Sequence, residues 1–176
     1  DTLAIVGPGP IGLCLLQAAR AGGGVKIAVL GMEKDRKRLE TARSLGAELA
    51  LSVDGDEGVR DRVLSGTGGL GVDIAVDATG TRAGALLALD LVRRGGKVCL
   101  VGVSDDPLLI KPFSQLMMKE VDLVSSLARL PSTWYRTLRL VESGRIDLDP
   151  LVGERFPLDD ALAGFDQRNV LWCRDN

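Results

Sequence analysis

Short apolar runs alternate with helical stretches over most of this chain, and the alternation limits the folds that it can adopt. Each run is rich in valine, leucine or isoleucine and is almost continuously apolar, as is typical of strands in a parallel sheet covered on both faces. Strands joined through helices imply right-handed crossovers, so we expect an α/β fold with a doubly wound parallel sheet. The predicted strands are Leu3–Val6, Lys26–Leu30, Glu48–Ser52, Asp73–Val76, Lys97–Val101 and Val121–Ser125. The predicted helices between them are Pro10–Ala21, Lys34–Leu45, Gly58–Leu64, Arg82–Val92 and Phe113–Met118.

The pattern changes after residue 126. Residues 131–146, PSTWYRTLRLVESGRI, predict a helix that is capped by Ser132 or Thr133 and ends at Gly144. A short extended piece, a turn at Pro157 and a short helix with Asp159 near its start should follow. We therefore expect two parts: the doubly wound domain, residues 1–127, and a short C-terminal helical and extended appendage, residues 128–176.

Composition excludes several classes of function. The 176 residues carry 22 basic and 24 acidic side chains, well interspersed, which argues against a nucleic-acid partner or a polybasic membrane patch. No apolar run approaches the roughly 20 residues of a membrane span, and no signal peptide is visible. The chain has no histidine, which excludes Ser-His-Asp and Cys-His nucleophile systems, histidine bases and histidine-containing metal sites.

The cysteines are the other informative part of the composition. Cys14, Cys99 and Cys173 are far apart, odd in number and form no Cys-x-x-Cys pair. This usage favours a reducing compartment, the cytoplasm, with no disulfide framework. We expect no metal site and no catalytic residue within this chain.

The first apolar run leads directly into the glycine-rich turn GPGPIG. Gly7, Gly9 and Gly12 fit the pattern G-x-G-x-x-G between a predicted strand and a predicted helix. In the Rossmann fold the first glycine permits a tight turn, the second lets a pyrophosphate approach the backbone, and the third allows close packing of helix and strand. The pyrophosphate then lies at the positive end of the helix. The turn therefore predicts a dinucleotide site, although glycines that serve packing alone and a site for S-adenosylmethionine are the alternatives.

The choice between NAD and NADP depends on the end of the second predicted strand. An acidic residue is expected there, about 20 positions after the glycines, to hold the adenine ribose, but the strand ends at Gly31. Glu33 follows two residues later and favours NAD. Lys34, Arg36 and Arg38 are cations that can attract a 2′-phosphate, so NADP stays open.

Six stretches of the chain resemble, in order, the medium-chain dehydrogenases and reductases, especially the branch of zinc-dependent alcohol, polyol and threonine dehydrogenases. The resemblance extends from residue 2 to about residue 166 and is far more specific than the glycine motif alone. The stretches are VGPGPIGL, RLETARSLGA, GVDIAVDATG, LDLVRRGGKVCLVGV, KEVDLVSS and VESGRIDLDPLVGERFPLDDALAGFD.

The resemblance implies roles for residues around the glycine turn and the second strand. Gly9, Pro10 and Ile11 match the positions at which the family's backbone meets the pyrophosphate. Aligned on the downstream LGA, Glu33 matches the acid that binds the ribose, and Arg38 matches an arginine near the adenosine.

Two later strand exits match further cofactor contacts of the family. Ala78 and Thr79 fall beside the adenosine and nicotinamide riboses. Val101, Gly102 and Val103 match the segment that binds the carboxamide of the nicotinamide. Both sets follow predicted strands, where open α/β sheets bind ligands, although such sequences also occur as ordinary strand exits.

The chain also departs from the family's pattern. In the family, a catalytic domain with the zinc ligands precedes the glycine motif, and no such region precedes it here. We therefore expect the NAD(P)-binding domain of a parent enzyme that transfers hydride between a secondary alcohol and nicotinamide, with zinc held outside this chain. The chain alone should be inactive. The alternatives are a domain of a zinc-free medium-chain reductase and a non-catalytic nucleotide-binding or interaction module.

Association is a further expectation. Family members commonly pair through the last strand of the sheet, which here is the stretch near Val121–Ser125. An exposed apolar edge strand also favours pairing on physical grounds. We expect a homo-oligomer, with a monomer as the alternative.

Overall fold

The helices and strands follow the order that the apolar runs predict. The computed structural model describes residues 1–24, 26–54, 58–127, 130–153 and 155–165. Its strands are β1 (Thr2–Val6), β2 (Lys26–Gly31), β3 (Leu49–Ser52), β4 (Val72–Asp77), β5 (Val92–Leu100) and β6 (Asp122–Ser125). Its helices are α1 (Pro10–Ala21), α2 (Arg36–Ser44), α3 (Val59–Ser65), α4 (Arg82–Leu91), α5 (Ser114–Lys119) and α6 (Pro131–Glu142).

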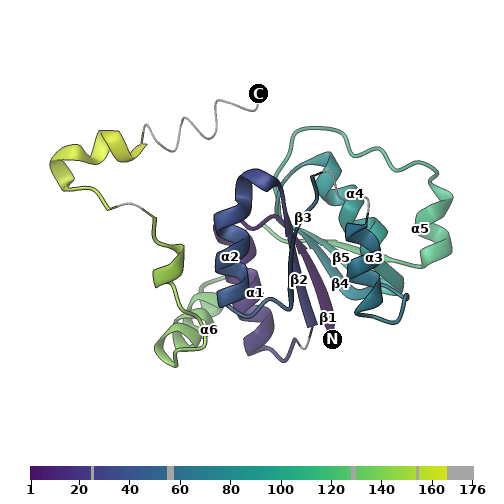
Figure 1. The fold of residues 1–176 in the computed structure, drawn as a ribbon, viewed down its shortest axis with the longest axis horizontal. Coiled ribbons are helices and arrows are strands. Elements are labelled where there is room, and N and C mark those ends of the chain that lie inside the picture. The colour runs from purple at the N-terminus through teal and green to yellow at the C-terminus, as the bar shows by residue number, and fades with distance from the viewer. Residues whose placement is uncertain (25, 55–57, 128–129, 154, 166–176) are drawn as a thin grey trace.

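Within the described residues, the strands form one six-stranded parallel sheet in the order β3-β2-β1-β4-β5-β6. Figure 1 shows α1 and α2 on one side of this sheet and α3 and α4 on the other. The chain changes direction across the sheet between β1 and β4, which is where open α/β sheets bind ligands. The predicted doubly wound parallel sheet is confirmed.

The core consists of two apolar layers, one on each face of the sheet. Ile5 and Val29 face α1 and α2, whereas Ala4, Val6 and Leu30 face α3 and α4. All five are buried. Burying a valine, leucine or isoleucine side chain stabilises the fold by about 1.5–3 kcal/mol, so both faces of the sheet contribute to stability. Burial on both faces also explains why the strands are almost continuously apolar in sequence.

The start of one predicted helix and the cap of another differ from the prediction. The stretch predicted as one helix from Lys34 divides into a 3₁₀ turn, η1 (Glu33–Asp35), and α2. At the start of η1, Asp35 Oδ2 accepts the Met32 N–H at 3.1 Å. In α6, Pro131 occupies the first turn, and no side chain caps the helix, so neither Ser132 nor Thr133 is the cap.

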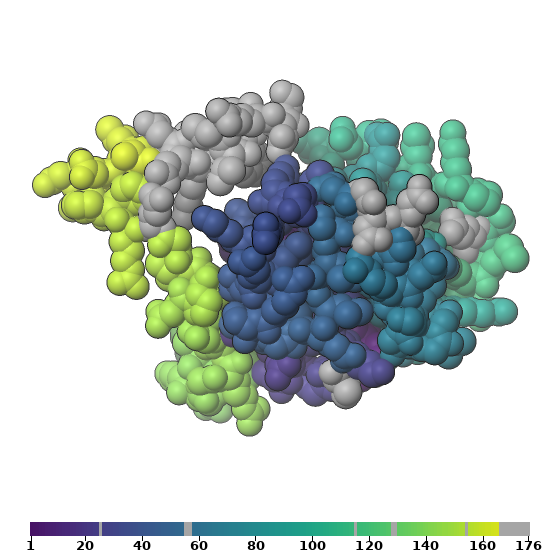
Figure 2. Space-filling view, in the orientation of Figure 1, coloured from purple at the N-terminus to yellow at the C-terminus, as the bar shows by residue number. Residues whose placement is uncertain are grey.

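The segment after α6 returns to the sheet domain. Gln17 of α1 is 4% exposed; its Nε2 donates to the Asp147 carbonyl at 2.9 Å, and its Oε1 accepts the Asp147 N–H at 2.6 Å. Ile146 is buried beside this contact. Short 3₁₀ turns follow, η2 (Asp149–Leu151) and η3 (Leu158–Asp160), and Figure 2 shows the last described segment, in yellow, standing out from the body. The domain boundary predicted at residue 128 and the tail 166–176 lie outside the described residues.

Candidate functional site

The glycines of the turn between β1 and α1 are required for different reasons. Gly7 has φ of +105°, and a Cβ there would approach Thr79 Cγ2 to 2.9 Å. A Cβ on Gly12 would overlap the carbonyl oxygen of Gly7. Gly9, in contrast, has ordinary extended backbone with φ of −67° and ψ of 179°, and no heavy atom lies within 4 Å of its ideal Cβ position. The fold therefore needs Gly7 and Gly12, whereas at Gly9 there is open space in front of the backbone.

The amino terminus of α1 lies at this open space. Pro10 occupies its first turn, no side chain caps it, and its first turn carries no acidic residue. Ile11, in the same turn, is exposed. The N–H groups and the positive end of a helix bind anions, so this geometry suits a phosphate that approaches over Gly9.

A cavity of about 520 Å³ lies next to the glycine turn. It opens between the carboxyl ends of β1, β2 and β4 and the start of α4. Apolar side chains cover part of its wall and charged groups another part. Its lining includes Val6, Gly7, Pro8, Leu30, Gly31, Met32, Lys34, Asp35, Val53, Asp54, Thr79, Thr81, Gly84 and Leu87.

Hydrogen bonds fix the exit of β4. Asp77 is 2% exposed, and its Oδ1 accepts the Thr79 N–H at 3.0 Å and the Thr79 hydroxyl at 2.6 Å. The Thr81 hydroxyl accepts the Gly84 N–H at 3.1 Å and so caps α4. The prediction omitted Asp77, although a carboxylate at the end of the apolar run VDIAVD was a signal for it. Asp77 thus orients the turn that carries the predicted site residues Ala78 and Thr79.

The exits of β4 and β5 lie side by side. The N–H groups of Val101 and Gly102 donate to the Asp77 carbonyl at 2.9 and 3.0 Å, and a Cβ on Gly102 would overlap the backbone of Gly80. Val103 is exposed. The structure therefore brings together the two predicted sets, one after each strand.

Glu33 and Arg38 lie differently from the other predicted site residues. Glu33 is exposed, is absent from the cavity wall, and donates its backbone N–H to Asp54 Oδ2 at 2.6 Å. Arg38 Nη1 lies 3.1 Å from Asp35 Oδ1. The acidic residues on the cavity wall near β2 are Asp35 and Asp54, which the sequence analysis did not select.

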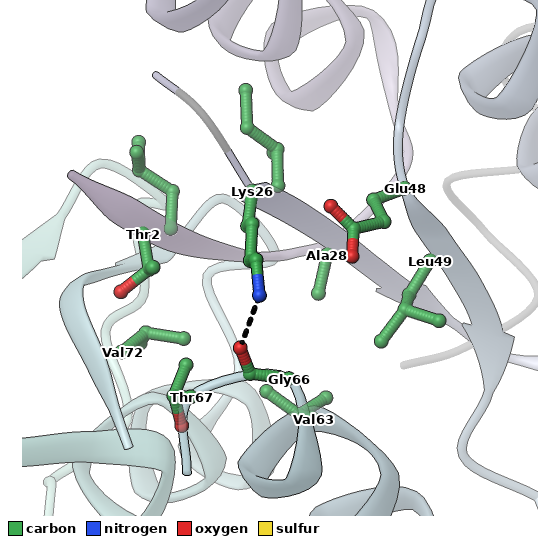
Figure 3. A pocket seen from close by; sticks show the side chains of 11 residues that line it. Thr2, Lys26, Ala28, Glu48, Leu49, Val63, Gly66, Thr67 and Val72 are labelled. Carbon is green, nitrogen blue, oxygen red and sulfur yellow. Dashed lines mark hydrogen bonds between the residues drawn. The ribbon is translucent and has the colours of Figure 1, made fainter. Parts of the chain in front are cut away.

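A much smaller cavity lies at the opposite end of the strands, at the amino ends of β1, β2 and β3. Figure 3 shows it between the starts of the first strands and the end of α3, where Lys26 Nζ donates to the Gly66 carbonyl at 2.8 Å. Its volume of about 20 Å³ leaves room for about one water molecule. It is therefore too small for a dinucleotide.

The part of the chain that the structure describes does not fit a zinc site. No histidine is present, and the described residues contain no group of three or more His, Cys, Asp or Glu side chains that could hold a metal ion. We therefore derive no catalytic step through zinc from this chain.

The described helices were also compared with the requirements of a membrane span. None of them has the length and apolarity that crossing a bilayer requires.

Comparison with known proteins gives consistent matches. The sequence pattern of the family described as zinc-binding dehydrogenase matches residues 10–143. L-arabinitol 4-dehydrogenase from Aspergillus niger is 37% identical over 178 residues, which cover 94% of this chain and 45% of that protein. D-arabitol-phosphate dehydrogenase from Enterococcus avium is 32% identical over 167 residues, covering 95% and 47%. An alcohol dehydrogenase from Thermotoga maritima superposes with a TM-score of 0.89 at 28% identity, covering 97% of this chain and 48% of that one. The chain spans about half the length of the curated relatives that it matches.

Proposed function

This chain belongs to the zinc-binding dehydrogenase family, and from that membership we propose that it binds the nicotinamide dinucleotide of an alcohol or polyol dehydrogenase. The observation that carries the proposal is the open approach over Gly9 to the uncapped start of α1, next to a cavity of about 520 Å³. In the fold, each of the other two glycines has a packing or conformational reason. Open space at Gly9 is what a bound pyrophosphate requires.

The cofactor would extend across the carboxyl ends of the strands. Its pyrophosphate would lie over Gly9, Pro10 and Ile11, and its adenosine would enter the cavity between the ends of β2 and β4. The nicotinamide half would lie toward the exits of β4 and β5. The packing of Gly102 against Gly80 holds these exits in contact and so fixes the spacing of the two segments.

In the parent enzyme, we propose, hydride passes between the carbon of a secondary alcohol and the nicotinamide that this domain holds. The described residues supply groups that bind and orient a dinucleotide. Relatives named for alcohols and for sugar alcohols support an alcohol or polyol as the substrate class. Because the chain spans about half of these relatives, we expect no turnover by this chain alone.

Titration of the purified chain with NADH tests the proposal. We expect saturable binding, measured by calorimetry and by the fluorescence of NADH, and no oxidation of alcohols when NAD⁺ is supplied. The proposal would be wrong if neither NADH nor NADPH bound at a concentration of about 1 mM. Such a result would favour a non-catalytic interaction module.

Location and assembly complete the proposal. Cys14 of α1 is a free thiol, which supports a reducing compartment such as the cytoplasm. The outer edge of β6 supports association of two copies, and we propose that residues 128–176 are a return segment that packs against a further domain of the parent.

A further inference from the structure

We infer that Asp35 and Asp54 select NAD over NADP, in place of an acidic residue at the end of β2. The inference rests on the proposed dinucleotide binding. It concerns the part of the cavity that would receive the adenosine ribose, and it depends on three features: a position closed to side chains, two fixed carboxylates, and donors that are already occupied.

The position at which Rossmann folds usually carry the ribose-binding acid is closed here. That acid follows the glycine motif by about 20 residues and ends the second strand. Gly31 ends β2 in this chain. A Cβ on Gly31 would lie 2.6 Å from Pro8 Cγ and 2.9 Å from Pro8 Cδ, closer than real Cβ atoms approach. Because Pro8 is part of the glycine turn and its ring is rigid, the space for a strand-end side chain is filled.

Two carboxylates reach the cavity from elsewhere. Asp35 comes from η1, where its side chain is 13% exposed, and Asp54 follows β3. Both line the cavity with Gly31 and Met32. Asp35 Oδ2 accepts the Met32 N–H at 3.1 Å, and Asp54 Oδ2 accepts the Glu33 N–H at 2.6 Å. Backbone hydrogen bonds therefore hold both acids in place at the end of β2.

The same hydrogen bonds disfavour a 2′-phosphate. A phosphate beside β2 would need backbone N–H groups and cations, and the N–H groups of Met32 and Glu33 already donate to carboxylates. Arg38 pairs with Asp35 at 3.1 Å. Among the described residues that line the cavity, Lys34 is the cation and Asp35 and Asp54 are the anions. A ribose hydroxyl can donate to a carboxylate, whereas a phosphate next to two carboxylates is repelled.

The test compares NADH with NADPH in binding to the same chain. We expect wild type to bind NADH at least about tenfold more tightly than NADPH. The double substitution Asp35→Asn with Asp54→Asn keeps oxygens that can accept the backbone N–H groups but removes both charges. It should lower the preference by about tenfold or more, chiefly by tightening NADPH and weakening NADH. Asp61→Asn, which makes the same change at an exposed position of α3 outside the cavity wall, is the matched control and should leave the ratio unchanged.

Each other result would overturn the inference. Preference of the wild type for NADPH, or an unchanged ratio in the double variant with native circular dichroism, contradicts it. The single substitution Glu33→Gln is a further check. If it lowers the preference for NADH over NADPH as much as the double substitution does, Glu33 selects the cofactor, as the sequence predicts. Failure of wild type to bind either dinucleotide would remove the proposed function together with the inference, whereas binding with an unchanged ratio removes the inference alone.

Discussion

At the scale of single residues, the three glycines of the turn separate the needs of the fold from those of a ligand. Sequence alone cannot make that separation, because all three fit one motif. The structure can, because it shows what a Cβ would meet at each position. At Gly12 it meets the carbonyl oxygen of Gly7, and at Gly9 it meets nothing within 4 Å. The two alanine variants should therefore behave differently.

Gly12→Ala should unfold more easily, by about 3 kcal/mol or more, because α1 must move away from the turn to admit a methyl group. Gly9→Ala should keep the wild-type free energy of unfolding within about 1 kcal/mol, since its φ and ψ suit alanine. It should nevertheless bind NADH at least about tenfold more weakly, because its methyl group occupies the approach to α1. Urea unfolding and calorimetric titration measure the two quantities. Full NADH affinity in Gly9→Ala would contradict the assignment of that space to the pyrophosphate.

Asp73 gives the molecule a predictable dependence on acid. The Thr2 N–H at 2.7 Å, Arg93 Nε at 2.7 Å and the Thr2 hydroxyl at 2.9 Å stabilise the carboxylate and lower its pKa from 3.8 to about 2. Because the folded-state pKa lies below the unfolded value, the stabilisation is present above about pH 4 and is lost as the pH falls toward 2. Asp73→Asn should therefore be less stable than wild type at pH 6, with a difference that shrinks toward pH 2. Urea titrations at several pH values measure this, and Asp61→Asn, at an exposed site, should show no such convergence.

At the scale of elements, apolar runs were enough to place the strands, because both faces of the sheet are buried. The start of β5 could not be placed in this way. Val92 pairs with Val72, and after an irregularity Lys97 pairs with Ile74, so the strand begins five residues before its predicted start. That pairing joins segments about 20 residues apart, and no pattern in the residues next to Val92 indicates it. Asp54 was missed for the same reason, since it lies 21 residues from the Glu33 N–H that it accepts.

The junction of α4 and β5 depends on a side chain from another helix. No loop separates Leu91 from Val92, and Lys119 of α5 donates to the carbonyls of Leu89 and Asp90 at 2.8 Å and of Val92 at 3.1 Å. Partial burial lowers the pKa of this ammonium, although Asp90 counteracts the effect. The last carbonyl groups of a helix have no hydrogen-bond partner within that helix. Lys119 therefore supplies the donor for the carbonyls at the end of α4.

Lys119→Met should lower the free energy of unfolding by about 2 kcal/mol, because it keeps much of the side-chain volume but leaves these carbonyls without their donor. Lys37→Met, on the exposed face of α2, is the control and should change stability by less than about 0.5 kcal/mol. Chemical unfolding of both variants measures the difference. Equal stability of the two would mean that water replaces the ammonium group at the junction.

At the scale of the whole molecule, the sheet ends in an exposed strand. β6 pairs with β5 on one side, and all four of its residues are exposed, with Leu123 and Val124 at 45% and 39%. Met117 and Met118 of the neighbouring α5 are also exposed. An edge strand with apolar side chains and unpaired backbone groups is a template for another strand, which is the physical basis for expecting two copies to pair there.

Val124→Lys tests this arrangement. A charge on the edge strand disfavours strand pairing between chains, so a wild-type dimer should become a monomer with unchanged circular dichroism. Sedimentation velocity or light scattering at increasing protein concentration measures the mass. Leu70→Lys adds the same charge at an exposed apolar residue in the loop before β4, an interior strand of the sheet, and should leave the dimer intact. A monomeric wild type, or a dimer that persists in Val124→Lys, would show that β6 does not pair.

A second variant, Leu123→Lys, separates pairing along the edge from contact through one face of the sheet. Leu123 and Val124 carry side chains on opposite faces of the strand. A dimer that is lost in Leu123→Lys but kept in Val124→Lys would therefore assign the contact to one face of the sheet rather than to its edge.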